Sequence, residues 1–96
     1  MNKDDCIFCK IVKKEIPASI VYEDEELLAF KDINPIDKVH LLIIPKEHIE
    51  NLFSCKKKHN ELLSKMLLLA PKLAKENGLE GFRVMINSGA KGGQEV

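Results

Sequence analysis

Val39-His-Leu-Leu-Ile-Ile-Pro-Lys-Glu-His-Ile49 is the stretch that decides how this chain folds. Its first six residues are β-branched or otherwise apolar apart from His40, and they stop at Pro45, which lacks the N–H that a sheet ladder needs. Because side chains alternate along a strand, His40 shares one face with Leu42. We therefore expect a strand covered on both sides, with one histidine in it and a second, His48, just beyond its end.

Five further elements are expected around this stretch. Two strands joined by an acidic turn predict a β-hairpin before it, and a short helix, a main helix with an apolar stripe and a last strand follow it. In chain order these elements are Ile20–Glu23, Leu27–Asp32, Glu47–Phe53, His59–Asn77 and Phe82–Asn87. The glycine-rich residues from Ser88 to Val96 come next, and the backbone N–H groups of such a loop can approach an anion such as phosphate.

Length and charge limit the classes of protein that this chain can represent. Its 96 residues predict a single domain spanning 1–96, with one core. Lysine plus arginine number 15, as do aspartate plus glutamate, so no net field draws in nucleic acid or an anionic membrane. The N-terminal residues contain no apolar signal core, and the apolar runs are too short to span a bilayer, so we place the protein in the cytoplasm.

Cys6-Ile-Phe-Cys9 is the first motif that carries chemistry. This spacing brings two thiolates close enough to hold one zinc ion. Redox dithiols share the spacing but usually follow a strand and open a helix, and almost nothing precedes the motif here. Two small buried hydrophobic residues remain an equal alternative. The total of three cysteines, an odd number, fits a reducing compartment better than a disulfide framework.

Asp32 lies on the same strand face as Phe30 in the predicted hairpin. A carboxylate beside an aromatic ring can cap the end of the strand, which is the simpler interpretation. It can also accept hydrogen bonds from sugar hydroxyls next to a ring that stacks on a base. The residues alone leave both interpretations open.

Several segments together resemble the histidine-triad (HIT) family of nucleotide hydrolases and transferases, particularly its small Hint-like branch. They occur in family order across nearly the whole chain: Cys6-Ile-Phe-Cys-Lys-Ile11, Glu15-Ile-Pro-Ala18, Val21-Tyr-Glu-Asp24, Leu28-Ala-Phe-Lys-Asp-Ile33, His40-Leu-Leu-Ile-Ile-Pro-Lys46, His48-Ile49 and Asn87-Ser-Gly…Gly-Gly-Gln94. In the family, a final strand reading His-x-His-x-His follows this loop and carries the nucleophile. The sequence ends at Val96, before that strand, so we expect a chain ending there to lack activity.

The resemblance implies an α+β fold. We expect a twisted antiparallel sheet of about five strands when complete, the last one missing here, with one main helix packed across it. It also implies a homodimer formed through that helix and an edge strand.

The resemblance further implies a site for a purine nucleotide, carried over residue by residue. Asp32 would accept hydrogen bonds from the ribose hydroxyls, and His40 would orient the histidines of the following strand without being the nucleophile. The residues implied to line the base pocket are Phe8, Ile11, Ile16, Phe30, Ile33 and Leu42, and those implied around the α-phosphate are Asn87, Gly93, Gln94 and Val96.

Structural zinc is the one cofactor that the resemblance implies, with no organic cofactor. Cys6, Cys9 and His48 look like three of its ligands, and the fourth would be a histidine of the missing strand. With three ligands we expect a weaker site completed by water, or no metal. His48 as a surface histidine at a helix start is the alternative.

The function implied is hydrolysis of purine nucleotide phosphoramidates or related nucleotidyl bonds through a nucleotidyl-histidine intermediate. The alternative is a nucleotide-binding or zinc-stabilised module without turnover. A redox protein would require a reversible disulfide between Cys6 and Cys9, and retention of zinc by those thiols would argue against it.

Overall fold

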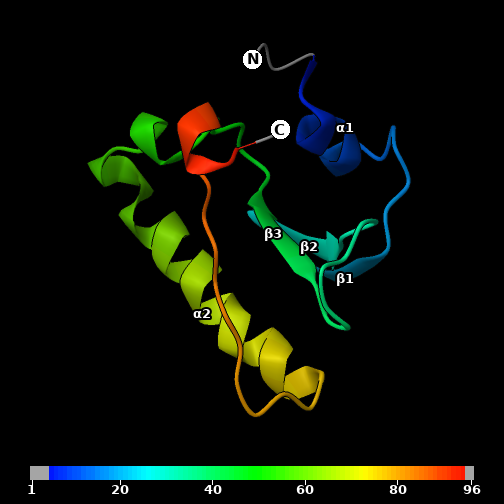
Figure 1. The fold of residues 1–96 in the computed structure, drawn as a ribbon. Helices are drawn as coiled ribbons and strands as arrows, with labels where there is room; N and C mark the ends of the chain where they lie inside the picture. Colours follow the sequence, from blue (N-terminus) through cyan, green and yellow to red (C-terminus); the bar gives the residue numbers. More distant parts are fainter. Residues whose placement is uncertain (1–4, 95–96) are drawn as a thin grey trace. The chain divides into compact units, whose positions relative to one another are not determined.

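The computed structural model describes residues 5–94 of the chain (Figure 1). The chain divides into two compact units, Met1–His48 and Ile49–Val96. A short helix and a sheet make up the first unit, and the main helix belongs to the second. Among the residues that the structure describes, no helix is long and apolar enough to cross a membrane.

The first unit is built on a three-stranded antiparallel sheet in the order β1-β2-β3. Strands β1 (Ile20–Glu23) and β2 (Leu27–Lys31) form the predicted hairpin, and β3 (Leu41–Pro45) pairs with β2. Asp24 makes the tight turn, because its Oδ1 accepts hydrogen bonds from the backbone N–H groups of Glu26 at 2.8 Å and Leu27 at 2.7 Å. The hairpin prediction is therefore confirmed.

Strand β3 begins two residues later than the sequence predicts, because the chain is still bending through residues 36–39. Its register places Phe30 opposite Leu42, and beyond the strand the backbone N–H of Asp32 donates to the carbonyl of His40 at 3.0 Å. His40 thus precedes β3 and still pairs with the end of β2.

Helix α1 (Ile7–Val12) contributes to the apolar core of this unit. One side chain of α1 is buried in a cluster with residues from β2 and β3: Ile11, Leu28, Phe30 and Ile44. Strand β2 is buried on both faces, since Leu27 and Ala29, which alternate with the cluster residues, are also inaccessible. The sequence predicted such full coverage for β3 instead, but in β3 only Ile44 is buried and the other four residues are half-buried.

The second unit contains helix α2 (Asn60–Glu76), and this confirms the predicted main helix to within one residue at each end. Leu62, Leu69 and Leu73 form its buried stripe, and the helix continues through Pro71. Short 3₁₀ turns flank it: η2 (Leu52–Ser54), η3 (Lys57–His59) and, after a long extended segment, η4 (Ala90–Gly92).

The prediction of a short helix over residues 47–53 is wrong. Only the single turn η2 forms, because Asn51 is extended and its side chain accepts a hydrogen bond from the N–H of Phe53 at 2.9 Å, which starts the turn. Cys55 then returns to an extended conformation and stops it.

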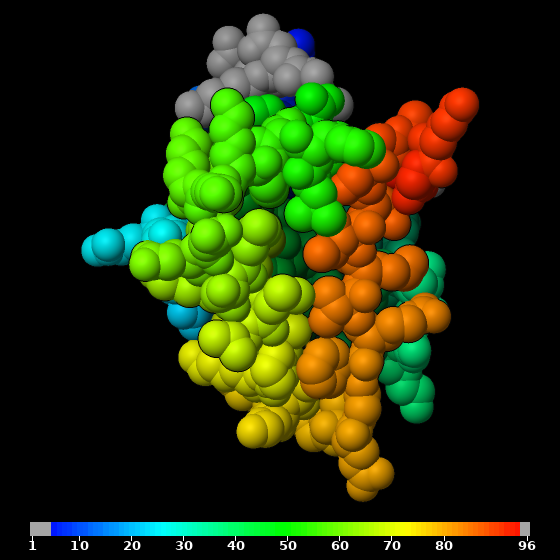
Figure 2. All heavy atoms as spheres, turned by 90° about the vertical axis from the view of Figure 1, so that its left-hand side faces the viewer, coloured from blue at the N-terminus to red at the C-terminus, as the bar shows by residue number. Residues whose placement is uncertain are grey.

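The prediction of a strand over residues 82–87 is also wrong for the part of the chain that the structure describes. This segment runs back alongside α2 (Figure 2), yet its backbone joins no ladder, and its large side chains are exposed. A strand needs a neighbour to satisfy its N–H and C=O groups, and the hydrophobic pattern alone does not supply one. The α+β class, with an antiparallel sheet and one main helix, is confirmed.

Candidate functional site

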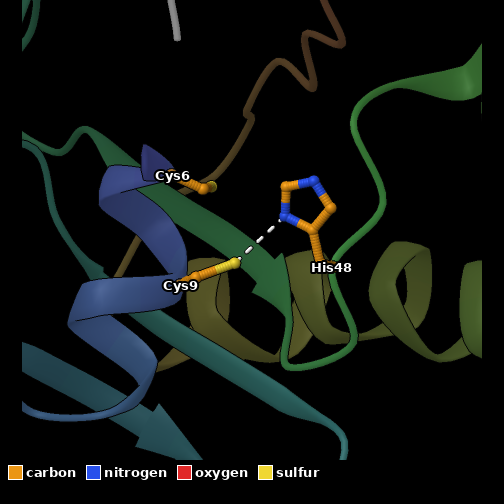
Figure 3. A group of neighbouring side chains, drawn as sticks. All are labelled: Cys6, Cys9 and His48. Carbon is orange, nitrogen blue, oxygen red and sulfur yellow. Dashed lines mark hydrogen bonds between the residues drawn. The ribbon is translucent and has the colours of Figure 1, made fainter. Parts of the chain in front are cut away.

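Cys6, Cys9 and His48 converge in the first unit (Figure 3), and their sulfur and nitrogen ligand atoms all lie within 4.8 Å of one another. Cys6 is the residue before α1 and Cys9 lies three positions on, so one helical turn brings both thiols to the same side. His48 follows the end of β3, and its Nδ1 lies 3.0 Å from the sulfur of Cys9. Both cysteines are buried and the histidine is half-buried.

This set of donors fits a zinc ion. Two thiolates and one imidazole nitrogen are ligands that zinc prefers, and ligand atoms this close can share one tetrahedral ion. The same contact also allows a sulfur–imidazole hydrogen bond without metal. The structure therefore brings together all three residues that the sequence suggested as ligands.

Five of the six residues suggested for the base pocket gather in one apolar cluster on the sheet. Two of them, Ile11 and Phe30, are buried in it, and three more pack against it half-exposed: Phe8, Ile16 and Leu42. The rings of Phe8 and Phe30 lie 6.2 Å apart at a tilt of 55°. Ile33 lies outside this cluster, because it sits in the loop after β2 with 88% of its surface exposed.

Asp32 and His40 face each other at the open end of the β2–β3 pair. The Oδ2 of Asp32 lies 3.5 Å from the Nε2 of His40, and its Oδ1 accepts from the N–H of Asn34 at 2.9 Å. The Nδ1 of His40 accepts from the backbone N–H of Ile36 at 3.2 Å. A backbone N–H can only donate, so the proton of the neutral imidazole lies on Nε2, toward the carboxylate.

The glycine-rich loop lies in the second unit and closes on itself. The backbone N–H groups of Gly92 and Gln94 both donate to the carbonyl of Gly89, at 3.0 and 3.1 Å. Gly89 and Gly93 have positive φ values of 78° and 89°, a conformation that side chains disfavour. Asn87 lies next to Gly93, and a Cβ built there would meet its Cγ at 3.5 Å. Val96, the remaining residue suggested for the phosphate, lies outside the described residues.

Sequence reasoning missed an ionic cluster around Glu23. Its carboxylate contacts the ammonium groups of Lys14 at 2.8 Å and Lys46 at 2.9 Å. Hydrogen bonds from Lys14 and then Lys46 lower the pKa of Glu23 below its ordinary value. The lysines come after α1 and at the end of β3, so sequence spacing gave no signal for this cluster.

Asn51 and Ser88 were missed as well. The Nδ2 of Asn51 donates to the Oε1 of Gln94 at 3.0 Å, and the Oγ of Ser88 accepts from the N–H of Leu52 at 3.3 Å. The only available signal was that asparagine often precedes a helical turn.

The chain is similar to known proteins in both sequence and structure. Residues 5–96 match the family model described as "Scavenger mRNA decapping enzyme C-term binding". The chain is 55% identical over 94 residues to Protein HitA of Neisseria gonorrhoeae, which covers 97% of this chain and 88% of HitA. It is 47% identical over 95 residues to the 14 kDa zinc-binding protein of Brassica juncea, covering 96% of this chain and 84% of the relative. Among solved structures, a HIT family hydrolase from Legionella pneumophila Philadelphia 1 is similar with a TM-score of 0.93 and 48% identity, covering 96% of this chain and 84% of that one.

Proposed function

The chain belongs to the histidine-triad (HIT) family, and we propose that residues 1–96 bind a purine nucleotide for hydrolysis of a phosphoramidate or a related nucleotidyl bond. The chain is similar to a HIT family hydrolase of known structure. The substrate and the mechanism are the proposed part.

The apolar cluster on the sheet is the observation that supports this assignment most directly. Ile11 and Phe30 are buried in this cluster, and half-exposed Phe8, Ile16 and Leu42 pack against it and present apolar surface. A flat purine ring gains by leaving water for such a surface, and the two phenylalanine rings offer faces or edges to it. Ile33 is exposed and would reach a base only from the loop after β2.

Asp32 is proposed to accept the ribose hydroxyls. Its carboxylate is half-buried at the end of β2 and already accepts one backbone N–H. An ionised carboxylate has about four lone-pair sites, so capacity remains for hydroxyl donors. His40, with its proton on Nε2 toward Asp32, is a supporting residue that fixes the orientation of neighbouring groups.

The reaction needs a nucleophile that residues 1–96 do not contain, since His48 lies in the cysteine cluster and His59 is buried with its Nδ1 accepting from the N–H of Lys56. We assign that role to a histidine of the family's His-x-His-x-His strand. Its ring nitrogen attacks phosphorus, the amine or other leaving group departs with a proton, and water then releases the nucleoside monophosphate. Loop 88–94, which includes Gly93, and the preceding Asn87 are assigned to the phosphate.

Cys6, Cys9 and His48 would hold a structural zinc ion. Water or a histidine of the family's His-x-His-x-His strand would supply the fourth ligand, and a thiolate-rich site of this kind stabilises a fold and does not take part in the reaction. It would fix α1 to the end of β3, the two segments from which its ligands come. The relative named 14 kDa zinc-binding protein supports this assignment.

The ribose contact gives the sharpest test of nucleotide binding. Asp32→Asn should weaken binding of adenosine 5′-monophosphate about tenfold, because hydrogen bonds to a charged group are lost. The variant should leave binding of the 2′,3′-dideoxy analogue unchanged, since that ligand offers no hydroxyl. Titration calorimetry with both ligands on both proteins measures the difference.

Asp37→Asn is the matched control, because Asp37 lies in the same loop and its carboxylate accepts from the neighbouring N–H of Lys38. It should leave both affinities at the wild-type value. Failure of wild-type residues 1–96 to bind the monophosphate would contradict the proposal. An equal loss of affinity for both ligands in Asp32→Asn would show that Asp32 does not contact the ribose.

Turnover separates the hydrolase from a binding module. A form of the chain joined to a relative's histidine strand after Val96 should hydrolyse adenosine 5′-phosphoramidate, and His40→Ala should slow it. Residues 1–96 alone should bind without turnover. Binding by both forms and hydrolysis by neither would favour the binding module.

A further inference from the structure

The side chain of Gln94 is engaged inside its own unit. Its Oε1 accepts from the backbone N–H of Gly89 at 2.7 Å and from the Nδ2 of Asn51 at 3.0 Å, and its Nε2 donates to the carbonyl of Glu50 at 2.8 Å. These bonds use both lone pairs of the amide oxygen and one of the two amide hydrogens. Gln94 was expected to contact the α-phosphate, and these bonds instead hold its side chain against residues 50, 51 and 89.

Gly89 and Gln94 are joined by a reciprocal pair of hydrogen bonds. The N–H of Gly89 donates to the side chain of Gln94, and the N–H of Gln94 donates to the carbonyl of Gly89 at 3.1 Å. Between them, the N–H of Gly93 donates to the carbonyl of Ala90 at 3.1 Å. The pair closes the loop into a ring in which Gly89 and Gly93 have positive φ values.

Asn51 uses both ends of its side chain at once. Its Oδ1 accepts from the N–H of Phe53 and begins η2, which fixes the amide plane, and its Nδ2 then points at Gln94. The N–H of Leu52 donates to Ser88 from the same segment. A side chain held at one end is already ordered, so little entropy is lost when its other end holds Gln94.

From these contacts we propose that Gln94 is the latch that closes loop 88–94, and that Asn51 is the positioning residue that holds the latch. Gln94 then acts on a phosphate through the shape of the loop and does not touch it. The phosphate part rests on the function proposed above. The closed loop itself rests only on contacts among residues 50–94.

The test follows the amide hydrogen of Gly89 by hydrogen exchange in the 96-residue chain, and the affinity for adenosine 5′-monophosphate in parallel. Gln94→Ala removes the latch. Asn51→Asp keeps the oxygen that caps η2 but turns a second oxygen toward the Oε1 of Gln94, where the two acceptors repel. Each variant should speed hydrogen exchange of the Gly89 amide. Each should also weaken binding of the monophosphate about fivefold, the scale of one lost hydrogen bond.

Non-additivity distinguishes a latch from a ligand. The double variant should bind the monophosphate no more weakly than Gln94→Ala, because both changes break the same interaction between Asn51 and Gln94. Asn60→Asp is the matched control: it makes the same chemical change on an exposed residue of the same unit, and it should leave Gly89 exchange at the wild-type rate.

Unchanged Gly89 exchange in Asn51→Asp would overturn the proposal. The proposal would also be overturned if only Gln94→Ala weakened nucleotide binding while the Gly89 amide stayed protected from exchange. That pattern is expected of a residue that contacts the phosphate directly. If the wild-type chain bound no monophosphate, the proposed function would be contradicted. The exchange rates of the Gly89 amide would then be the test of the latch.

Discussion

At the residue scale, Cys9 and His48 are 39 positions apart and come within 3.0 Å of each other. Cys9→Ser should lower the affinity for Co²⁺, a spectroscopic stand-in for zinc, by at least tenfold, because the serine hydroxyl is a poor replacement for a thiolate ligand. Loss of the thiolate-to-cobalt absorption band measures it.

Cys55→Ser is the control for this change, since Cys55 belongs to the second unit and is not a member of the Cys6, Cys9 and His48 group; its sulfur lies 3.9 Å from the carbonyl oxygen of Asn51. It should leave the cobalt spectrum and affinity unchanged. A Cys9→Ser protein that still shows the wild-type spectrum would remove Cys9 from the metal site.

Glu23 carries a pH prediction. Its pKa is lowered by Lys14 and Lys46, so its ionised form stabilises the fold above its ordinary pKa of 4.5, and this stabilisation is lost as the pH falls through the lower folded value. Glu23→Gln should therefore lower the melting temperature near about pH 7 and match wild type near about pH 2.

Thermal melts across that range measure the effect, with Glu25→Gln as the matched loss of one charge from the turn between β1 and β2. The control should track wild type at every pH. A constant difference between Glu23→Gln and wild type at all pH values would show that the contribution is not ionic.

Which residues carry chemistry could be predicted in part from the sequence. Cys6 and Cys9 were identifiable because their Cys-x-x-Cys spacing is typical of metal ligands, whereas His48 was suggested only by the family resemblance. Asn51 and Glu23 were not, because their partners are distant in sequence and of ordinary types. Side-chain hydrogen bonds leave no periodic pattern to detect.

At the element scale, hydrophobic pattern and turn chemistry predicted the β-hairpin and α2 closely. The prediction of a helix over residues 47–53 was wrong because a single capped turn and a short helix have similar composition. The side chain of Asn51 decided between them. The prediction of a strand over residues 82–87 was wrong because strand formation depends on a partner strand outside the segment. Local sequence preference therefore predicts an element best when the element satisfies the hydrogen bonds of its own backbone.

Pro71 gives a prediction for α2. It lies inside the helix, where it supplies no N–H and its ring crowds the preceding turn. Pro71→Ala should therefore stabilise the second unit, by about 1 kcal/mol or more. Urea denaturation followed by far-ultraviolet circular dichroism measures the change.

Ser64→Ala, at an exposed position of the same helix, is the control and should change the free energy of unfolding by less than about 0.5 kcal/mol. Destabilisation by Pro71→Ala would show that the proline ring packs usefully in this helix.

At the scale of the whole molecule, we propose a homodimer formed through α2. Leu67 and Leu68 are adjacent on this helix, with 54% and 70% of their surfaces exposed. Leu68→Glu should shift the native mass from dimer to monomer, because a buried carboxylate without a partner is costly at an interface.

Lys58→Glu, an exposed residue before the helix, is the control for added negative charge and should stay dimeric. A wild-type protein that is monomeric at all concentrations in native mass spectrometry would contradict the dimer.

The family could be predicted from the sequence because its motifs are spread over nearly the whole chain in a fixed order. The division into two compact units could not, since it depends on how contacts are distributed after folding. Ile33 illustrates the same limit, because its family position suggested a pocket and its loop leaves it exposed.

The most direct test of the account is a titration of the isotope-labelled chain with adenosine 5′-monophosphate, followed residue by residue by NMR. A nucleotide site on this sheet predicts saturable shifts at Phe8, Ile16, Leu42 and Asp32, with Cys55 and the exposed face of α2 unchanged. Absence of shifts, or shifts confined to residues outside the apolar cluster, would contradict a nucleotide site on this sheet.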